Sequence, residues 1–497
     1  MQAEILRMDR VTYKENGIVQ LNQFNLHIFK GEILGLICLN SQGLEALIML
    51  LQQNLPLHYG NIYFKETLVN TYLHNANTAP NKVVVIEKKS RLVDSMTVSD
   101  NVFVLRSGFR KYLIAPRVLA TQLHFIAKEL GVEIDADARV EDLSFFKRCV
   151  VELYKAVASG AKLIVIRDIS NFVSVSNLAK LQEILQFYAQ KGVSFLYVCN
   201  HHEEIFALCK RAAIMQNGQI IKVLPCNAQT ETIMQTYARP FHTLVQKQRQ
   251  SMEIQEIHAA AQLAEETVFA VQNLACGANE QLDFTVKKGE CIVLQDMENT
   301  ILQPLLSILS GNEPPQGGTI ELAGHNVTHH LYRRRDIAIL AEKPIETMLF
   351  PDLSYLDNLC FTLDQRMTGV WCHARLRNSI AAELAPELGD VFDKDINELT
   401  VAQRYTLVYQ RILLQKPQIV FCVQPFASAD MVLRMHIIQL LQKLLQKQIA
   451  VVILAVNLSD SLALANRLLL VEHGCVTQSI ARAEFATLSA HAPWEKI

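Results

Sequence analysis

Hydrophobic residues along the chain gather in short, continuous runs that polar turns separate. LIVIRD (163–168) and QIVFCV (418–423) are runs of this kind, as strands that are buried on both faces of a sheet require. Each half of the chain opens with β-rich segments, continues through a helical middle and closes with alternating strands and helices. This order predicts an α/β fold with a mainly parallel sheet flanked by helices, and an inserted helical subdomain.

The same order of elements occurs twice. FNLHIFKGEILGLI (24–37) recurs as LDFTVKKGECIVLQ (282–295), and the segment at 142–168 matches the segment at 398–424 at nearly the same spacing. The chain between the two copies is polar and rich in Gln and Glu. We therefore interpret the chain as a tandem duplication. The predicted divisions are a first domain at 1–240, a linker at 241–266 and a second domain at 267–497, with helical subdomains at about 90–142 and about 345–398.

Composition and charge limit the classes of partner that we expect for this protein. A net charge of −2 over 497 residues gives no electrostatic reason to expect nucleic acid or an anionic membrane surface as a partner. No apolar run approaches the roughly 18–20 residues that cross a bilayer, so we expect no direct membrane insertion. The 11 cysteines form no CxxC pair, which favours buried, reduced thiols over a metal site. We expect a cytoplasmic protein, peripheral at the inner face of the plasma membrane if a membrane partner holds it there.

One segment has the outline of a phosphate-binding loop. ICLNSQGLEALIMLL (37–51) follows the strand-like KGEILGL and leads into an apolar helical pattern. Phosphate-binding loops use glycines, a lysine and a Ser/Thr hydroxyl to hold phosphates and Mg²⁺. Here a single glycine is followed by Leu44, Glu45 and Ala46. The strand–loop–helix outline is kept, but the groups that hold phosphate are missing.

Other segments point to a family. KGEILGL, VSDNVF (98–103), HHEEIF (201–206) and NGQI (217–220) resemble segments of the ATP-binding cassette (ABC) ATPases. The two-domain layout and FPDLSYLDNL (350–359) resemble the tandem ATPase subunit of ribose/galactose/xylose-type sugar importers. The resemblance implies two P-loop NTPase-like parallel sheets, each with an antiparallel β subdomain and a helical subdomain. It also implies ATP and Mg²⁺ as cofactors, and a membrane permease that docks on the helical subdomains.

In the first half, the positions that this resemblance assigns to nucleotide binding have mostly changed. Leu44 takes the position of the lysine, Glu45 and Ala46 take that of the Ser/Thr pair, and only Asn40 and Gly43 survive. A carboxylate beside a triphosphate is unfavourable by about 1–4 kcal/mol even when partly solvated. We expect Glu45 to cap the helix in place of the phosphate.

The second half has lost its phosphate-binding loop more completely. Its loop reads QDMENTILQP (295–304), in which Leu302 takes the lysine position and Gln303 and Pro304 follow. Asp296 and Glu298 are expected to cap the following helix from within. We therefore expect no bound nucleotide and no metal in either half.

The catalytic positions have changed as well. Asp168 and Gln424 stand where the family has the glutamate that polarises water, and Arg167 precedes Asp168 where the family has the Mg²⁺ aspartate. We expect Arg167 to neutralise Asp168. Asn200 stands at the position of the switch histidine in the first half. No half keeps a general base together with a metal carboxylate, so no intact catalytic residue is expected.

The signature loop, LSGGQ in the family, reads LSFFK and LTVAQ. Phenylalanines at glycine positions obstruct a phosphate but bury apolar area. Lys88 holds the position of the glutamine that senses Mg²⁺ and couples to the permease, and Tyr13 that of an adenine-stacking aromatic. The signature-loop positions are Leu143, Ser144, Phe145, Phe146, Leu399 and Thr400.

These losses leave three functions open. The first is a non-hydrolysing pseudo-ATPase that acts as a structural or regulatory partner of a permease or signalling complex, with its halves paired within the chain by direct apolar contact. The second is a working carbohydrate-importer ATPase that uses ATP and Mg²⁺, which fold similarity alone implies. The third is a soluble scaffold unrelated to transport.

Overall fold

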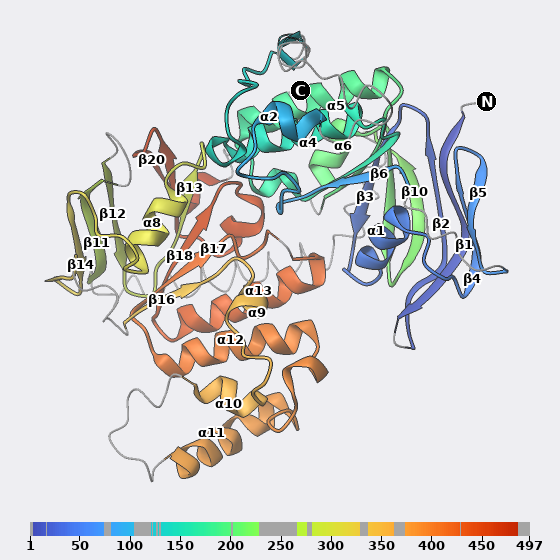
Figure 1. Cartoon of the computed structure of the whole chain (residues 1–497). Coiled ribbons are helices and arrows are strands. Elements are labelled where there is room, and N and C mark those ends of the chain that lie inside the picture. Colours follow the sequence, from blue (N-terminus) through green and yellow to red (C-terminus); the bar gives the residue numbers. More distant parts are fainter. Residues whose placement is uncertain are drawn as a thin grey trace. The chain divides into compact units, whose positions relative to one another are not determined.

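The chain forms two compact units, one within Met1–Arg239 and one within Pro240–Ser489, and each is described by itself. The structure is a computed structural model (Figure 1). The residues that it describes are 3–15, 17–73, 81–103, 121, 123–125, 128, 131–199, 202–227, 266–275, 281–328, 336–361, 373–427 and 429–485. The predicted linker at 241–266 lies outside these residues except for its last position.

The first unit contains two sheets. The smaller one is antiparallel, with strand order β2-β1-β4-β5. The larger one has strand order β10-β9-β3-β8-β7-β6 and is parallel except for its edge strand β10. The strands are β1 (Glu4–Glu15), β2 (Ile18–Phe29), β3 (Ile33–Cys38), β4 (Tyr59–Phe64), β5 (Thr67–Thr71), β6 (Val83–Ile86), β7 (Leu163–Arg167), β8 (Ser194–Val198), β9 (Arg211–Gln216) and β10 (Gln219–Pro225).

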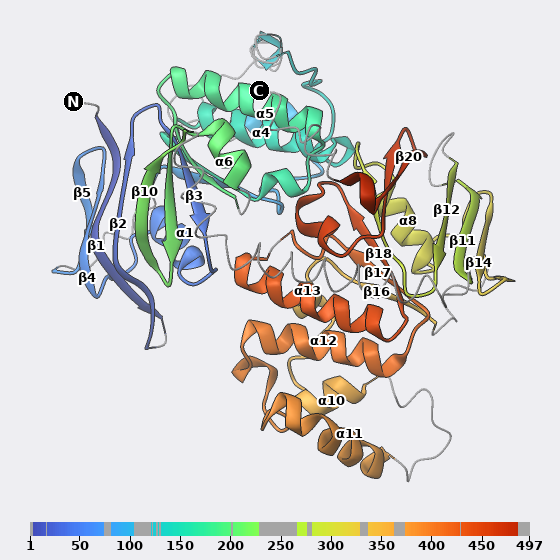
Figure 2. The same cartoon turned by 180° about the vertical axis from the view of Figure 1, so that it is seen from behind.

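Helices cover both faces of the larger sheet, which is why its central strands are mostly apolar. Every residue of β3 and β8 is buried. The helix α1 lies between the two sheets and shares a core with β1, β2 and one face of β3 (Figure 1). The helices α4, α5 and α6 lie on the opposite face (Figure 2). The described helices are α1 (Leu44–Gln52), α2 (Val98–Phe103), α4 (Phe145–Ala158), α5 (Val175–Gln190) and α6 (His202–Leu208).

The second unit repeats this architecture. Its antiparallel sheet has the order β12-β11-β14-β15 and its larger sheet the order β16-β17-β18-β13-β19-β20, which is the strand order of the first unit. The strands are β11 (Thr267–Leu274), β12 (Leu282–Lys287), β13 (Cys291–Asp296), β14 (Thr319–Leu322), β15 (His325–Asn326), β16 (Ile337–Leu340), β17 (Ile419–Val423), β18 (Ala450–Ala455), β19 (Arg467–Glu472) and β20 (Cys475–Ala481). The helices are α8 (Leu302–Leu309), α9 (Pro344–Thr347), α10 (Tyr355–Cys360), α11 (His373–Leu388), α12 (Val401–Gln415) and α13 (Met431–Gln446).

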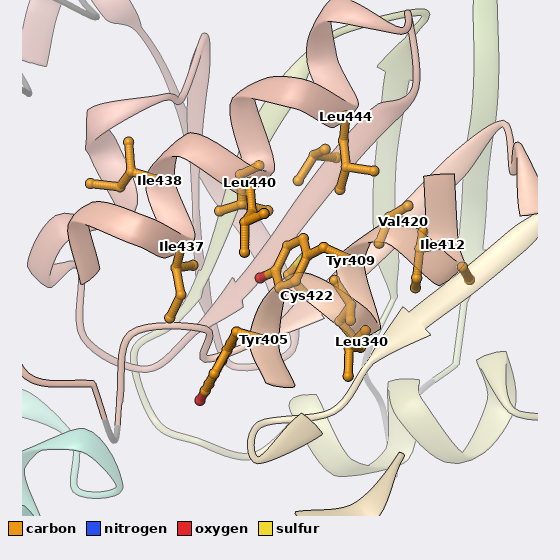
Figure 3. Close-up of a cluster of buried hydrophobic side chains, with 14 of the residues drawn as sticks. Leu340, Tyr405, Tyr409, Ile412, Val420, Cys422, Ile437, Ile438, Leu440 and Leu444 are labelled. Atoms are coloured by element: carbon orange, nitrogen blue, oxygen red, sulfur yellow. The ribbon is translucent and has the colours of Figure 1, made fainter. Parts of the chain in front are cut away.

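Two cores flank the larger sheet of the second unit. One encloses α8 between the two sheets. The other joins the opposite face to α12 and α13, where Tyr409 and Leu440 meet Cys422 of β17 (Figure 3). The fold predicted from the hydrophobic pattern is therefore confirmed in both units. Among the described helices, none combines the length and the hydrophobicity needed to cross a membrane.

Matching side-chain contacts support the duplication. Arg211 at the start of β9 binds both oxygens of Glu32, with Nε 2.6 Å from Oε1 and Nη2 3.1 Å from Oε2. Arg467 at the start of β19 binds Glu290 in the same way, at 2.6 and 3.2 Å. Each pair ties the beginning of the central strand to the beginning of its neighbour, so the two units share the contact as well as the topology.

A buried asparagine in each unit holds the start of the helical subdomain. Asn358 of α10 accepts a hydrogen bond from the backbone N–H of Phe350 and donates to the carbonyls of Phe350, Leu353 and Ser354, at 2.9–3.1 Å. Asn101 of α2 makes three equivalent bonds in the first unit, to the N–H and carbonyl of Val93 and to the carbonyl of Thr97. One amide side chain thus satisfies several backbone groups of a tight loop.

We expect Asn358→Ala to destabilise the second unit, because it leaves buried backbone groups without partners at about 1–3 kcal/mol for each group. Thermal unfolding of the full chain measures this loss. The exposed Asn397→Ala is the matched control and should change little. Equal effects of the two substitutions would contradict the role of Asn358.

Candidate functional site

The loop between β3 and α1 in the first unit corresponds to the phosphate-binding loop. Its glycine, Gly43, has φ 84°, and a Cβ there would lie 2.3 Å from the carbonyl oxygen of Gln20 and 3.1 Å from the Cα of Gly218. Asn40 exchanges hydrogen bonds with Asn217, which lies in the turn between β9 and β10. The two residues that survive from the family pattern therefore serve to pack the loop against the chain's own backbone.

The lysine position lies inside the hydrophobic core. The side chains of Leu44 and Ala46 are buried, and both belong to the cluster that α1 shares with the two sheets. A lysine that reached phosphates from this position would have to leave that core. Leucine stabilises the start of α1 by burial instead.

The expectation that Glu45 caps α1 is wrong. The helix has Gly43 as its N-cap and no side chain caps it. Glu45 lies in the first turn, where the helix dipole favours an anion, but its carboxylate binds the guanidinium of Arg167 at the end of β7. The arginine is a stronger partner for the carboxylate than a backbone N–H group, because the hydrogen bond between them joins two charged groups.

Arg167 contacts two further carboxylates. Its Nη1 lies 3.7 Å from Glu87 Oε2, and its Nε lies 3.8 Å from Asp168 Oδ2. Burial by itself lowers the pKa of Arg167, but the hydrogen bond and charge of Glu45 and the charges of Asp168 and Glu87 raise that pKa overall. Arg167 is thus a permanently charged group at the position where the resemblance places the Mg²⁺ aspartate.

Asp168 and Gln424 occupy the same backbone conformation in the two units. Their φ angles are 49° and 41°, in the left-handed region. The N–H of Asp168 donates to Val198 at 3.0 Å, and that of Gln424 donates to Leu454 at 2.8 Å. The two units therefore share one backbone geometry where the resemblance places a catalytic glutamate, and the amide that stands at one of these positions cannot act as a base.

In the second unit, a carboxylate at the end of β13 binds the beginning of the helix α8. Asp296 is 1% exposed, and its Oδ2 accepts hydrogen bonds from the N–H groups of Ile301 at 2.7 Å and Leu302 at 3.2 Å. Asp296 therefore binds the N–H groups at the beginning of α8, as the sequence suggested, and these are the groups that an anion would otherwise bind. Glu298 does not cap the helix: its carboxylate accepts from the N–H of His473.

In the second unit, other side chains also fill the positions that the resemblance assigns to the lysine and to the switch histidine. Leu302 is buried and Gln303 is exposed at the start of α8. The amide of Gln295 donates to the carbonyl of Val456, which follows β18 where the resemblance places a switch histidine. In the first unit the corresponding position, Asn200, lies outside the described residues.

The signature-loop positions act as helix caps. Ser144 accepts a hydrogen bond from the N–H of Lys147 at the start of α4. Thr400 and Gln403 form a capping box at the start of α12. Leu143 is half-buried and Leu399 is buried, so each places an apolar side chain just before its cap.

The two phenylalanines of the first signature loop point to different surroundings. Phe146 is buried, whereas the half-buried ring of Phe145 meets the ring of Phe172 edge-on at 5.5 Å. The ammonium group of Lys88 lies 4.4 Å from the centre of the Phe172 ring. Lys88 and Phe145 are thereby joined by one aromatic side chain of the loop after β7.

Tyr13 lies on β1 and is half-buried. It packs against the core that encloses α1, and its ring meets His58 at 6.5 Å. Burial raises the pKa of Tyr13, and Glu15 adds to the rise. The Tyr13 side chain therefore takes part in the packing of the β subdomain.

Glu87 and Glu152 were missed from the sequence. Glu87 follows the apolar strand β6 directly, which was the available signal, since charged groups at the carboxyl ends of parallel strands form the usual binding edge of such sheets. Glu152 lies within α4 and is buried. It accepts hydrogen bonds from Ser90 Oγ at 2.8 Å and from the N–H of Arg91. These contacts fix the segment after β6 on α4.

Several known proteins are similar to this chain. The ABC transporter family model matches residues 21–168. An arabinose import ATP-binding protein of Burkholderia ambifaria is 22% identical over 97% of this chain and 92% of its own length. A ribose import ATP-binding protein of Streptomyces coelicolor (98% and 93%) and a xylose import ATP-binding protein of Geobacillus kaustophilus (97% and 97%) are also 22% identical.

The chain is similar to these import proteins along nearly its whole length. It has the ABC nucleotide-binding fold in two copies. A solved structure of a nucleotide-free ATP-binding cassette from an ABC transporter is 18% identical, with a TM-score of 0.39, and covers 46% of this chain and 95% of its own.

The side chains of the two ABC units do not fit Mg·ATP, the group that the fold implies. A leucine is buried at each lysine position, Glu45 is paired with Arg167, and Asp296 already binds the N–H groups that a phosphate needs. Among the described residues, no group of three or more His, Cys, Asp or Glu side chains is placed to hold a metal ion.

We expect Asp296→Ala to destabilise the second unit by about 1–3 kcal/mol for each buried N–H group that it leaves without a partner. Asp296→Asn keeps one acceptor oxygen and should lose less. The exposed Asp352→Ala is the control, and thermal unfolding is the measurement. A stability of Asp296→Ala equal to that of the control would contradict the capping role.

The burial of Glu152 predicts that the stability of the first unit depends on pH. Burial raises the pKa of Glu152, against the opposing effects of the Arg91 N–H, the Ser90 hydroxyl and Lys155. In the unfolded chain the pKa of a glutamate is about 4.3. Stability is therefore lost as the pH rises from that value through the raised pKa, because the folded state then gives up a proton that it holds more tightly.

Glu152→Gln removes this titration and keeps an acceptor for both hydrogen bonds. The stability of the variant relative to the wild type should therefore increase between pH 4 and pH 8. Thermal unfolding across this range measures the difference, with the exposed Glu141→Gln as the control. A difference that stays constant or falls with rising pH would show that Glu152 is not the titrating group.

Proposed function

We propose that the chain is a non-hydrolysing ABC-type subunit, related to carbohydrate importers, that acts as a structural or regulatory partner of a membrane permease. The main support is that both phosphate-binding loops are occupied by the chain's own charged groups, Glu45 with Arg167 in the first unit and Asp296 in the second. A triphosphate would have to displace these groups and would meet carboxylates in both places.

The names of the relatives support the transport part of the proposal. They are described as arabinose, ribose and xylose import ATP-binding proteins, and the similarity extends over nearly the whole chain. A subunit of this kind is cytoplasmic and peripheral, held at the inner face of the plasma membrane by its permease.

The helical subdomains are the proposed contact with the permease. In the second unit the rings of Phe350 and Phe361 are exposed and lie 4.3 Å apart on either side of α10 in sequence. Val93, which the first unit has at the position of Phe350, is also exposed. Exposed apolar side chains at matching places suit protein contact.

A second candidate function is a working ATPase of a carbohydrate importer. Its support is that the relatives over the whole length are described as ATP-binding. This function requires Leu44 or Leu302 to be bypassed and Arg167 to leave Glu45, and it requires a base other than Gln424 in the second unit.

Thermal unfolding with and without millimolar Mg·ATP separates the two. We expect no change in melting temperature. A ligand at 100 times its Kd would stabilise the protein by about 2.7 kcal/mol, which raises the melting temperature by several degrees. A ribose import relative measured in parallel is the positive control. A clear shift of this chain would refute the non-hydrolysing function and favour the ATPase.

A further inference from the structure

Arg167 lies where three segments of the first unit meet. Glu45 belongs to the first turn of α1, Glu87 follows β6, and Asp168 follows β7. Figure 1 shows α1 beside β6, and the guanidinium reaches a carboxylate from each segment. One cation thus neutralises negative charge that comes from three separate parts of the fold.

The guanidinium suits this position. It is planar, keeps its charge at every physiological pH and donates hydrogen bonds in several directions, so one side chain can serve several carboxylates. Its own side chain is 22% exposed. A permanent charge that is this far removed from water is stable only if opposite charges face it, and the three carboxylates supply them.

The second unit provides an internal comparison. The positions that correspond to Glu45, Glu87, Arg167 and Asp168 are held by Gln303, Ala341, Val423 and Gln424. All four are uncharged. The arginine and its carboxylates are therefore present together in one unit and absent together in the other, as expected if the cation and the carboxylates form one functional group.

We propose that the guanidinium of Arg167 takes the place of a divalent metal ion. Its charge holds together the beginning of α1 and the ends of β6 and β7. This inference rests on the proposed function, because it requires that no metal–nucleotide complex occupies the loop. The guanidinium also separates the carboxylates, in line with the lack of a metal-binding group among the described residues. Without its charge, the same carboxylates would repel one another and accept a hard divalent cation.

The test uses the full chain without nucleotide, and Mn²⁺ alone as the probe. Arg167→Gln should melt at a lower temperature than the wild type in EDTA and recover several degrees in millimolar Mn²⁺. Electron paramagnetic resonance should show one Mn²⁺ bound per chain, at least about tenfold tighter than to the wild type, since a carboxylate cluster binds such ions through oxygen. The wild type should respond to Mn²⁺ in neither measurement.

Three variants serve as controls. Arg211→Gln removes an arginine that faces the single carboxylate Glu32, so it should gain no Mn²⁺ response. Arg167→Lys keeps the charge and should also gain none. Glu45→Gln added to Arg167→Gln should abolish the response, because one of the carboxylate ligands is lost.

Arg167→Gln that shows no Mn²⁺ response, or that stays unfolded in both EDTA and Mn²⁺, would overturn the inference. A wild type that binds Mn²⁺ as tightly as the variant would overturn it too. Because nucleotide is left out, these outcomes are separate from the ATP measurement: a response of the wild type to Mg·ATP would refute the proposed function whatever Mn²⁺ does to Arg167→Gln.

Discussion

The helix that follows the central strand of each unit packs its first leucine into the core, and its first backbone N–H groups and positive dipole end favour a partner. In nucleotide-binding proteins of this architecture a phosphate is such a partner. Backbone groups that are buried without partners are strongly destabilising, so the helix start cannot simply be left empty. The other features of both loops follow from how this requirement is met.

The two units meet it differently. In the second unit Asp296 turns back onto the N–H groups of Ile301 and Leu302, so the loop closes on itself. In the first unit the loop is pressed onto neighbouring backbone at Gly43, and Glu45 faces outward to Arg167. One solution uses hydrogen bonds to the helix itself and the other an ion pair between elements. The first arrangement gives backbone N–H groups of the helix a partner, whereas the second neutralises the carboxylate in the first turn of its helix.

The same backbone geometry recurs in both units because packing maintains it. Asp168 and Gln424 share a left-handed conformation, and each donates its N–H to the end of the neighbouring strand. The Arg211–Glu32 and Arg467–Glu290 pairs and the buried Asn101 and Asn358 recur in the same way. None of these contacts involves a ligand. A backbone conformation persists when the surrounding structure determines it, whether or not the side chain still reacts.

The sequence alone determined the duplicated α/β fold, and it led to the prediction that the phosphate-binding side chains are missing. Buried parallel strands require continuous apolar runs, and a leucine at a lysine position is visible without coordinates. The aspartate that caps α8 could also be inferred, because it lies only a few residues from the N–H groups that it binds. Only the tertiary structure decided that Glu45 binds Arg167 and that Glu87 joins them. Such partners are far apart along the chain, and sheet order brings them together through packing that no local pattern records.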